Sequence, residues 1–214
     1  ISPVDISQGR AETIMGVSRD ITVRKSSEEK LYNSYSRIQK AFDDTIKALA
    51  SLVETKDPYT SGHQKRVAKI ATALANELNL PRENINAVNI ASNIHDIGKI
   101  YVPESILTKP GRLSDIEYEL MKTHPKVGSE LIGTIDFPWP VARIILQHHE
   151  RMDGSGYPDG LKNEDIILEA RILAVADVVE AMSSHRPYRP ALGIEKALDE
   201  IKANKSKLYD LQIA

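Results

Sequence analysis

The chain has 214 residues, of which 41% are hydrophobic and 27% charged, the balance of a globular protein with room for one full domain and an appendage. Its net charge of −2 argues against broad electrostatic attraction to a nucleic-acid polymer or an anionic membrane, so a phosphate-bearing ligand would need local cations or metal ions. Because cysteine is absent, disulfides, thiolate zinc sites and cysteine nucleophiles are excluded, which is compatible with a cytoplasmic protein.

The first 26 residues differ from the rest of the chain. Short stretches around Met15 and Val23 favour β-structure, whereas almost everything later has helical periodicity. A lone strand or hairpin is not stable by itself. We therefore expect residues 1–26 to be a short β remnant, the end of a larger unit.

A long helix is predicted over residues 27–54. Apolar side chains and one threonine recur along it at spacings of four and three: Leu31, Tyr35, Ile38, Phe42, Thr45, Leu49 and Leu52. This heptad seam favours a dimeric coiled coil, and hence a homodimer through this helix. The alternative is a single helix that lays the same stripe on its own domain, and the pattern does not choose between the two.

Residues 55–214 have the periodicity of successive helices, so the predicted fold class is all-α. Thr60 or Ser61 can cap the first of these helices, and Ser114 with Glu117 forms a capping box that opens another toward His124. Residues 153–160 are expected to form a glycine-rich loop. No apolar run reaches the roughly 18–20 residues that span a bilayer, so no membrane segment is predicted.

Seven side chains that bind metals lie at helix ends or within apolar helical context: His63, His95, Asp96, His124, His148, His149 and Asp177. Adjacent residues on a helix diverge by about 100°, so the His95-Asp96 pair can reach one centre only if it lies close against its helix. Seven nitrogen and oxygen ligands are too many for one tetrahedral ion and suit two ions that share a bridging carboxylate.

Taken singly, these histidines are weak signals, because a lone histidine is as often a core or surface residue as a ligand. Asp177 is a stronger signal. It lies in the apolar stretch from Ala174 to Val179, where a carboxylate costs several kcal/mol unless it is paired or bound to a metal. The whole set therefore indicates a metal centre.

Four segments match a known pattern in order and in spacing: Lys56–His63, His95–Lys99, His148–Pro158 and Arg186–Arg189. Over about residues 55–205 the chain thereby resembles the HD-GYP family of phosphohydrolases. The resemblance implies an HD-superfamily bundle of about seven to nine helices in residues 55–214. It also implies hydrolysis of the bacterial second messenger cyclic di-GMP, to the linear dinucleotide pGpG or on to GMP.

The resemblance also implies a division of the ligands between two ions. His63, His95, Asp96 and Asp177 would surround one ion, and His124, His148 and His149 the other, with Asp96 as the bridge. Two cations about 3.5–4 Å apart would lower the pKa of a shared water and polarise the phosphodiester for in-line attack. All-nitrogen and oxygen ligation favours iron or manganese, with zinc or nickel as alternatives on purification.

Lys99 lies on the helical face of His95, where it can take a catalytic part by neutralising a phosphate oxygen; otherwise it is a solvated surface lysine. Gly98 is expected to let the substrate approach the backbone. By resemblance, the substrate-binding residues are those of the loop and two arginines whose guanidinium groups suit phosphate: Gly156, Tyr157, Pro158, Arg186 and Arg189.

Two further acids and one histidine remain to be assigned. Glu150 and Asp153 can either orient the histidines or stabilise the loop, and His185 is expected to be a surface residue. Some members of the family hold a third ion with a glutamate one turn before the first histidine. Tyr59 occupies that position here and Glu54 lies too far back, so we predict two ions.

Residues 15–24 resemble the last strand of a PAS sensor domain and its exit into a signalling helix. This resemblance implies that the chain is an excerpt of a longer sensor protein, in which residues 27–54 link an upstream PAS domain to the catalytic bundle. The chain also ends sooner after Tyr209 than the family usually does, so a terminal helix is expected to be missing.

Three functions remain open from the sequence. The first is a working cyclic di-GMP phosphodiesterase, which the full ligand set favours. The second is a catalytically weak sensor module that binds the dinucleotide and passes on a signal. The third is an HD phosphohydrolase that acts on another nucleotide.

Overall fold

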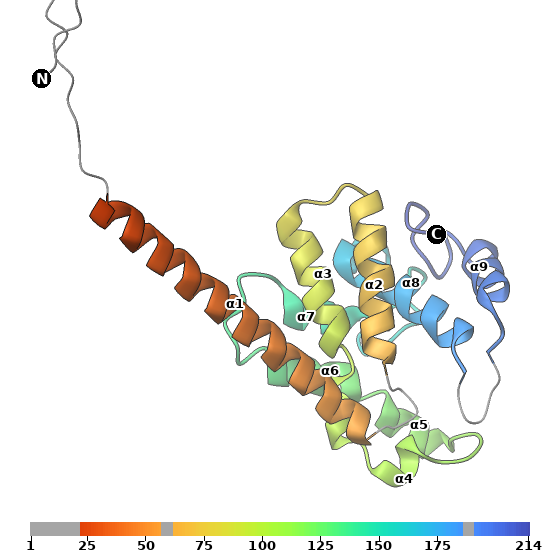
Figure 1. Cartoon of the computed structure of the whole chain (residues 1–214). Coiled ribbons are helices and arrows are strands. Elements are labelled where there is room, and N and C mark those ends of the chain that lie inside the picture. Colours follow the sequence, from red (N-terminus) through yellow and green to blue (C-terminus); the bar gives the residue numbers. More distant parts are fainter. Residues whose placement is uncertain (1–21, 57–61, 186–190) are drawn as a thin grey trace, which may run out of the picture. The chain divides into compact units, whose positions relative to one another are not determined.

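The computed structural model describes residues 22–56, 62–185 and 191–214. In these ranges the regular structure is helical (Figure 1), apart from one isolated bridge between Lys205 and Tyr209, and this confirms the all-α class. Of the expected β remnant, residues 1–26, the first 21 lie outside the described residues, as does the expected cap at Thr60 or Ser61. The β expectation around Val23 is wrong, because helix already begins at Thr22.

The elements are α1 (Thr22–Lys56), α2 (His63–Glu77), α3 (Arg82–Ile94), η2 (Ile97–Tyr101), α4 (Glu104–Leu107), α5 (Asp115–Met121), α6 (His124–Ile132), α7 (Val141–Gln147), η3 (Asn163–Asp165), α8 (Leu168–Ser183) and α9 (Ile194–Ala203), where η denotes a 3-10 helix. None of the described helices is both long and apolar enough to cross a membrane. The chain divides into two compact units, Ile1–Asp43 and Asp44–Ala214.

Helix α1 runs through both units and has a different buried stripe from the predicted one. Its last turns bury Ile46, Ala50 and Val53, which share a face because they are four and three residues apart. Leu52, a member of the heptad seam, is exposed. In the first unit the seam residue Leu31 is 72% exposed. Within the second unit, therefore, α1 packs a stripe that differs from the predicted seam, and the choice between a coiled coil and a helix on its own domain stays a prediction for the first unit.

The end of α1 is fastened to two neighbouring segments. The Glu54 carboxylate accepts a hydrogen bond from the backbone nitrogen of Gly62 at 2.9 Å, directly before α2. The Lys56 ammonium donates to the carbonyl oxygen of Ile100, in η2. These contacts attach the C-terminus of α1 to the segments on either side of the His63–Lys99 region.

Helices α2, α3 and α8 pack around the centre of the second unit. The α2 face in this core carries the small residues Val67, Ala71 and Ala75, which have no exposed surface and recur every four residues. Small side chains let neighbouring helices approach closely, and α8 contributes Ile172 and Leu173, which are also fully buried. This packing fixes the relative positions of the helices whose ends carry the predicted ligands.

Several helix ends occur where the sequence places them. The Ser114 hydroxyl accepts from the Glu117 nitrogen at 3.4 Å, and the Glu117 carboxylate accepts from the Ser114 nitrogen at 2.7 Å, which confirms the capping box. The helix it opens ends at Met121, however, and His124 begins the next helix, α6. The His95-Asp96 and His148-His149 pairs follow the last residues of α3 and α7.

Gly98 lies where η2 presses against the first turns of α6. A β-carbon at this position would be 2.0 Å from the carbonyl oxygen of His124 and 2.6 Å from the nitrogen of Gly128. The backbone that approaches Gly98 is therefore that of α6, which corrects the expectation that the glycine makes room for substrate. This close contact places η2, which follows His95-Asp96, directly against the backbone of His124.

We expect Gly98→Ala to lower the free energy of unfolding by about 3 kcal/mol, because a methyl group has no room between two backbones. Urea unfolding of the purified protein measures the change. Gly133→Ala is the matched control, since Gly133 has helical backbone angles (φ −63°, ψ −14°) and its nearest contact is within its own helix end. Equal stability of the two variants would contradict this account.

Candidate metal centre

The predicted ligands, from segments far apart in the sequence, lie in one continuous cluster. Ring centroids are 5.5 Å apart for His63 and His95, 5.1 Å for His95 and His148, and 5.0 Å for His124 and His149. Three groups have ligand atoms within 4.8 Å of one another: His124, His148 and His149; His63, His95 and Asp177; and His95, Asp96 and His148. All seven predicted metal ligands are members of these groups.

Three of the histidines are oriented by the ends of their helices. The Nδ1 atoms of His95, His124 and His148 lie 2.8, 2.8 and 2.6 Å from the carbonyl oxygens of the residues three positions earlier: Ser92, Met121 and Ile145. These carbonyls belong to last helical turns, where the chain leaves carbonyl oxygens without helical partners. Each Nδ1–H donates to its carbonyl, which leaves Nε2 as the free electron-pair donor.

The Nε2 atoms of His124 and His148 face each other at 3.4 Å. With both Nδ1 atoms as donors, these two nitrogens are both acceptors, so no hydrogen bond joins them. Two nitrogens bound at about 2.1 Å to one tetrahedral ion lie about 3.4 Å apart, so the pair fits a shared cation.

Burial keeps the imidazoles of His124, His148 and His149 neutral, the form that binds a metal ion. It lowers the pKa of His124 to about 4, and the pKa values of His148 and His149 well below the usual value, because an imidazolium loses its hydration in the interior. The three imidazoles are therefore neutral at neutral pH, as metal binding requires.

Asp96 lies between two groups of predicted ligands, one with His124, His148 and His149 and the other with His63, His95 and Asp177. One carboxylate oxygen is 3.5 Å from Nε2 of His124, and the other is 3.5 Å from Nε2 of His95. The side chain is buried, which alone would raise its pKa, but the Lys99 ammonium at 2.8 Å and the neighbouring imidazoles hold the pKa well below its usual range. Asp96 is thus an anion with one oxygen directed to each half, the arrangement that a bridging ligand needs.

The other half of the cluster centres on His63, at the start of α2. Its Nε2 atom is 3.1 Å from an oxygen of Asp177, which also lies 4.0 Å from Nε2 of His95. Burial alone would lower the pKa of His63, but Asp177 and Glu180 outweigh it and raise the pKa to about 9. The buried carboxylate in the apolar helix α8 is therefore paired, as the sequence required.

Glu180 is a part of the site that the sequence analysis missed. It lies on α8 one turn after Asp177 and is only 3% exposed. Its carboxylate hydrogen-bonds Nδ1 of His63, and it accepts from Nε of Arg66 at 2.6 Å. A carboxylate on the far nitrogen of a metal-binding histidine fixes the orientation of the ring. The spacing from Asp177 was the available signal, since residues three apart share a helix face.

The loop after His148-His149 is tied to the pair by Glu150. This buried carboxylate accepts from the backbone nitrogens of Asp159 at 2.7 Å and Leu161 at 3.0 Å. Asp153 likewise accepts from the nitrogen of Ser155. Of the two roles that the sequence left open, these hydrogen bonds of both acids support stabilisation of the loop.

The glycine of the loop passes over the backbone of the histidine pair. A β-carbon on Gly156 would lie 2.5 Å from the carbonyl oxygen of His149 and 2.5 Å from the nitrogen of Arg151. Tyr157, between this crossing and Pro158, has its ring 4.7 Å from the ring of His149. The loop therefore forms a wall next to the metal ligands.

The remaining predicted site residues differ in what the structure says of them. Lys99 is only 15% exposed and bonded to Asp96, so it is not a solvated surface lysine. His185 is exposed, as expected, and accepts from the nitrogen of Ala191. Arg186, Arg189 and Tyr59 lie outside the described residues.

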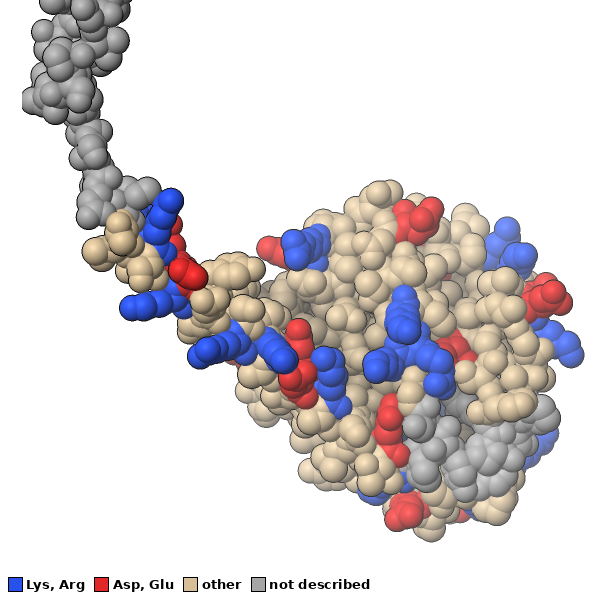
Figure 2. Space-filling model, viewed as in Figure 1, with Lys and Arg blue, Asp and Glu red and all other residues tan. Residues whose placement is uncertain are grey.

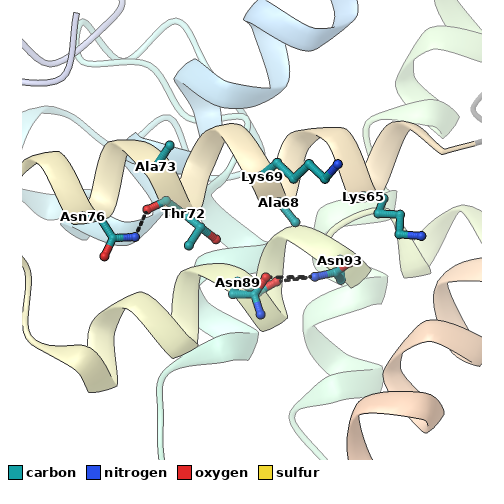
Figure 3. A pocket seen from close by; sticks show the side chains of 8 residues that line it. All are labelled: Lys65, Ala68, Lys69, Thr72, Ala73, Asn76, Asn89 and Asn93. Atoms are coloured by element: carbon teal, nitrogen blue, oxygen red, sulfur yellow. Dashed lines mark hydrogen bonds between the residues drawn. The ribbon is translucent and has the colours of Figure 1, made fainter.

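A separate hollow of about 440 Å³ lies between α2 and α3 (Figure 3). It is lined by Lys65, Ala68, Lys69, Thr72, Ala73, Asn76, Asn89 and Asn93. None of these is a predicted ligand, and the asparagines bond within their own helices, as from Asn93 to the carbonyl of Asn89. Figure 2 shows basic side chains gathered over α2 on the visible face. Because its lining includes none of the predicted ligands, this hollow is distinct from the candidate metal centre.

The sequence profile of the HD domain family matches residues 47–213, most of the chain. The chain belongs to the HD domain family. The matched range contains all seven predicted ligands, so the cluster lies in the conserved domain of this family and not in an appendage.

Curated relatives extend this comparison. The chain is 42% identical over 187 residues to the cyclic di-GMP phosphodiesterase response regulator RpfG of Xanthomonas campestris, covering 86% of this chain and 50% of that protein. It is 43% identical to the cyclic di-GMP phosphodiesterase PA4108 of Pseudomonas aeruginosa, over 71% of this chain and 37% of the relative. A 3′3′-cGAMP-specific phosphodiesterase of Vibrio cholerae is 36% identical over 77% of this chain and 36% of that protein. The chain thus spans half or less of the length of these relatives.

Solved structures agree in fold. An HDG"Y"P protein from Bdellovibrio bacteriovorus superposes with a TM-score of 0.58 at 22% identity, covering 71% of this chain and 48% of that one. The HD domain of the phosphodiesterase PgpH from L. monocytogenes superposes with a TM-score of 0.55 at 22% identity, covering 77% and 91%. These similarities confirm the helical-bundle fold, and the match to the HD domain family assigns this bundle to the HD type.

We expect Glu180→Gln to weaken the binding of Mn(II) by about 10–100-fold, because the amide is a poorer hydrogen-bond acceptor for His63 and its NH₂ group can face the ring. Calorimetric titration of chelator-treated protein with Mn(II) measures the affinity. Glu130→Gln, on an exposed position of α6, is the control and should bind like the unaltered protein. An unchanged affinity in Glu180→Gln would refute the orienting role.

Proposed function

We propose that the chain is the catalytic part of a metal-dependent phosphodiesterase that hydrolyses cyclic di-GMP to pGpG, GMP or both, in bacterial second-messenger signalling. The observation that carries the proposal is the convergence of five imidazoles and two carboxylates around a common centre within the HD domain. The names of the relatives that are 42% and 43% identical support this substrate.

The ligand atoms fit two divalent ions. His63, His95 and Asp177 would hold one, His124, His148 and His149 the other, and Asp96 would bridge them, since its two oxygens are directed to different halves. Such a pair of ions, when bound, activates water as a nucleophile and polarises the phosphodiester. The donor set of nitrogen and oxygen, with no thiolate in the chain, favours iron or manganese over zinc or nickel.

The protein's own groups hold and neutralise the substrate. Lys99, fixed by Asp96 at the edge of the centre, can pair with a phosphate oxygen. The ring of Tyr157, beside His149, offers a flat wall for a nucleobase, and Gly156 and Pro158 set its position in the loop. By resemblance, Arg186 and Arg189 add cations that suit phosphate.

A second candidate substrate is favoured by one comparison. The relative that is 36% identical is named as specific for 3′3′-cGAMP, so an HD domain similar to this one acts on another cyclic dinucleotide. The sensor alternative is less favoured, because all seven ligands are present and gathered.

The predicted context of the domain completes the proposal. We assign residues 1–26 to the end of a PAS-like sensor domain, residues 27–54 to a linking helix and residues 55–214 to the catalytic domain of a cytoplasmic protein. The exposed seam residues Leu31, Tyr35 and Ile38 support a homodimer through α1, because apolar side chains at heptad positions are commonly covered by a partner helix.

Anaerobic incubation with cyclic di-GMP after loading with Fe(II) or Mn(II) tests the function, with products separated by chromatography. The unaltered protein should release pGpG or GMP. Asp96→Ala should abolish turnover, because the bridge between the two ligand groups is lost. Asp199→Ala, which alters an exposed carboxylate on α9, should retain turnover of cyclic di-GMP. Binding without product would support the sensor, and turnover of another nucleotide alone would support the alternative substrate.

A further inference from the structure

Helix α5 is held beside the centre but contributes nothing to the core. It buries none of its residues. Its start is fixed by the capping box and by Lys109, which bonds the carboxylate of Glu117 at 2.6 Å. A helix that is well anchored at one end and has no buried face keeps its side chains available for contacts outside the protein core.

Tyr118 on α5 and Lys122, the residue directly after α5, lie on one face toward the loop. Tyr118 and Lys122 are four residues apart, so they share that face. The Lys122 ammonium is 5.2 Å from the centre of the Tyr118 ring and 5.7 Å from that of Tyr157, so it lies close to both aromatic rings. Because the Tyr157 ring is 4.7 Å from that of His149, Lys122 and Tyr118 continue the wall that starts at the metal ligands.

Both side chains remain accessible to a ligand. Tyr118 is 48% exposed, and the Lys122 side chain is 27% exposed. The carboxylate partner of Lys122 is Glu119 at 2.6 Å, but Glu119 is 69% exposed. Ion pairs with an exposed member contribute little, so the ammonium can exchange this carboxylate for a phosphate at small cost.

The chemistry of this arrangement suits one half of a dinucleotide. A nucleobase stacks on an aromatic ring, and an ammonium group pairs with a phosphate. A cyclic dinucleotide carries two phosphates, and when one is at the metal centre the other needs a cation farther along the wall. Resting on the proposed function, we propose that Lys122 and Tyr118 form a subsite for the nucleotide that is not being cleaved.

A comparison of two substrates distinguishes a contribution of this subsite from one of the metal centre. Cyclic di-GMP would occupy both, whereas bis(4-nitrophenyl) phosphate is a diester without a second nucleotide and needs the metal centre alone. Lys122→Met removes the charge and keeps an unbranched stem, and Lys122→Arg restores the charge. Lys126→Met, which alters an exposed lysine one turn later on α6, is the matched control.

We expect Lys122→Met to raise KM for cyclic di-GMP about tenfold, the effect of losing one charged contact, with kcat changed less than twofold. Tyr118→Leu should act in the same direction. Turnover of bis(4-nitrophenyl) phosphate should stay within twofold of the unaltered protein, and Lys122→Arg should recover most of the lost affinity. Equal losses on both substrates, or no loss on either, would overturn the subsite.

Equilibrium binding keeps this test separate from that of the proposed function. A slowly hydrolysed phosphorothioate analogue of cyclic di-GMP is titrated into the metal-loaded protein and the Lys122→Met variant. If the unaltered protein binds the analogue but never hydrolyses cyclic di-GMP, the phosphodiesterase proposal fails, while a tenfold weaker variant still supports the subsite. If the unaltered protein does not bind the analogue, the subsite is refuted.

Discussion

The arrangement of the centre depends on hydrogen bonds between histidine Nδ1 atoms and carbonyl oxygens at helix ends. His95, His124 and His148 each donate to the carbonyl of the residue three positions earlier. One bond satisfies a terminal carbonyl, selects the tautomer and turns Nε2 inward. The bundle thus places predicted ligands at helix ends, and the packing of α6 against α7 and η2, and of α3 against α7, sets the distances between these three histidines.

Much of this could be predicted because the signals are local or chemically costly. The capping box at Ser114 is a short-range pattern, and the structure contains it. Asp177 stood out because a carboxylate in an apolar helix needs a partner, and the structure supplies His63. The gathering of the histidines followed from the family resemblance more than from spacing, since no pattern in residues 63–149 alone fixes how helix ends meet.

What escaped prediction depends on contacts between distant segments. Glu180 pairs with His63 and Arg66 on another helix, and its spacing of three from Asp177 was the only local signal of this. A glycine is needed at position 98 because the backbone of α6, about thirty residues later, leaves no room for a β-carbon. Residues next to Gly98 in the sequence do not indicate this contact. The buried stripe of α1 also differs from the heptad seam, because shape complementarity to the bundle selects the buried face.

The fastening of α1 has a mechanical consequence. Its last turn bonds the nitrogen of Gly62 through Glu54 and the carbonyl of Ile100 through Lys56, and these atoms adjoin the segments that carry His63 on one side and Asp96 and Lys99 on the other. A sliding or rotation of the last turns of α1 would act on both segments together. The spacing between the two groups of predicted ligands would then change, so the position of the last turns of α1 is coupled to the geometry of the site.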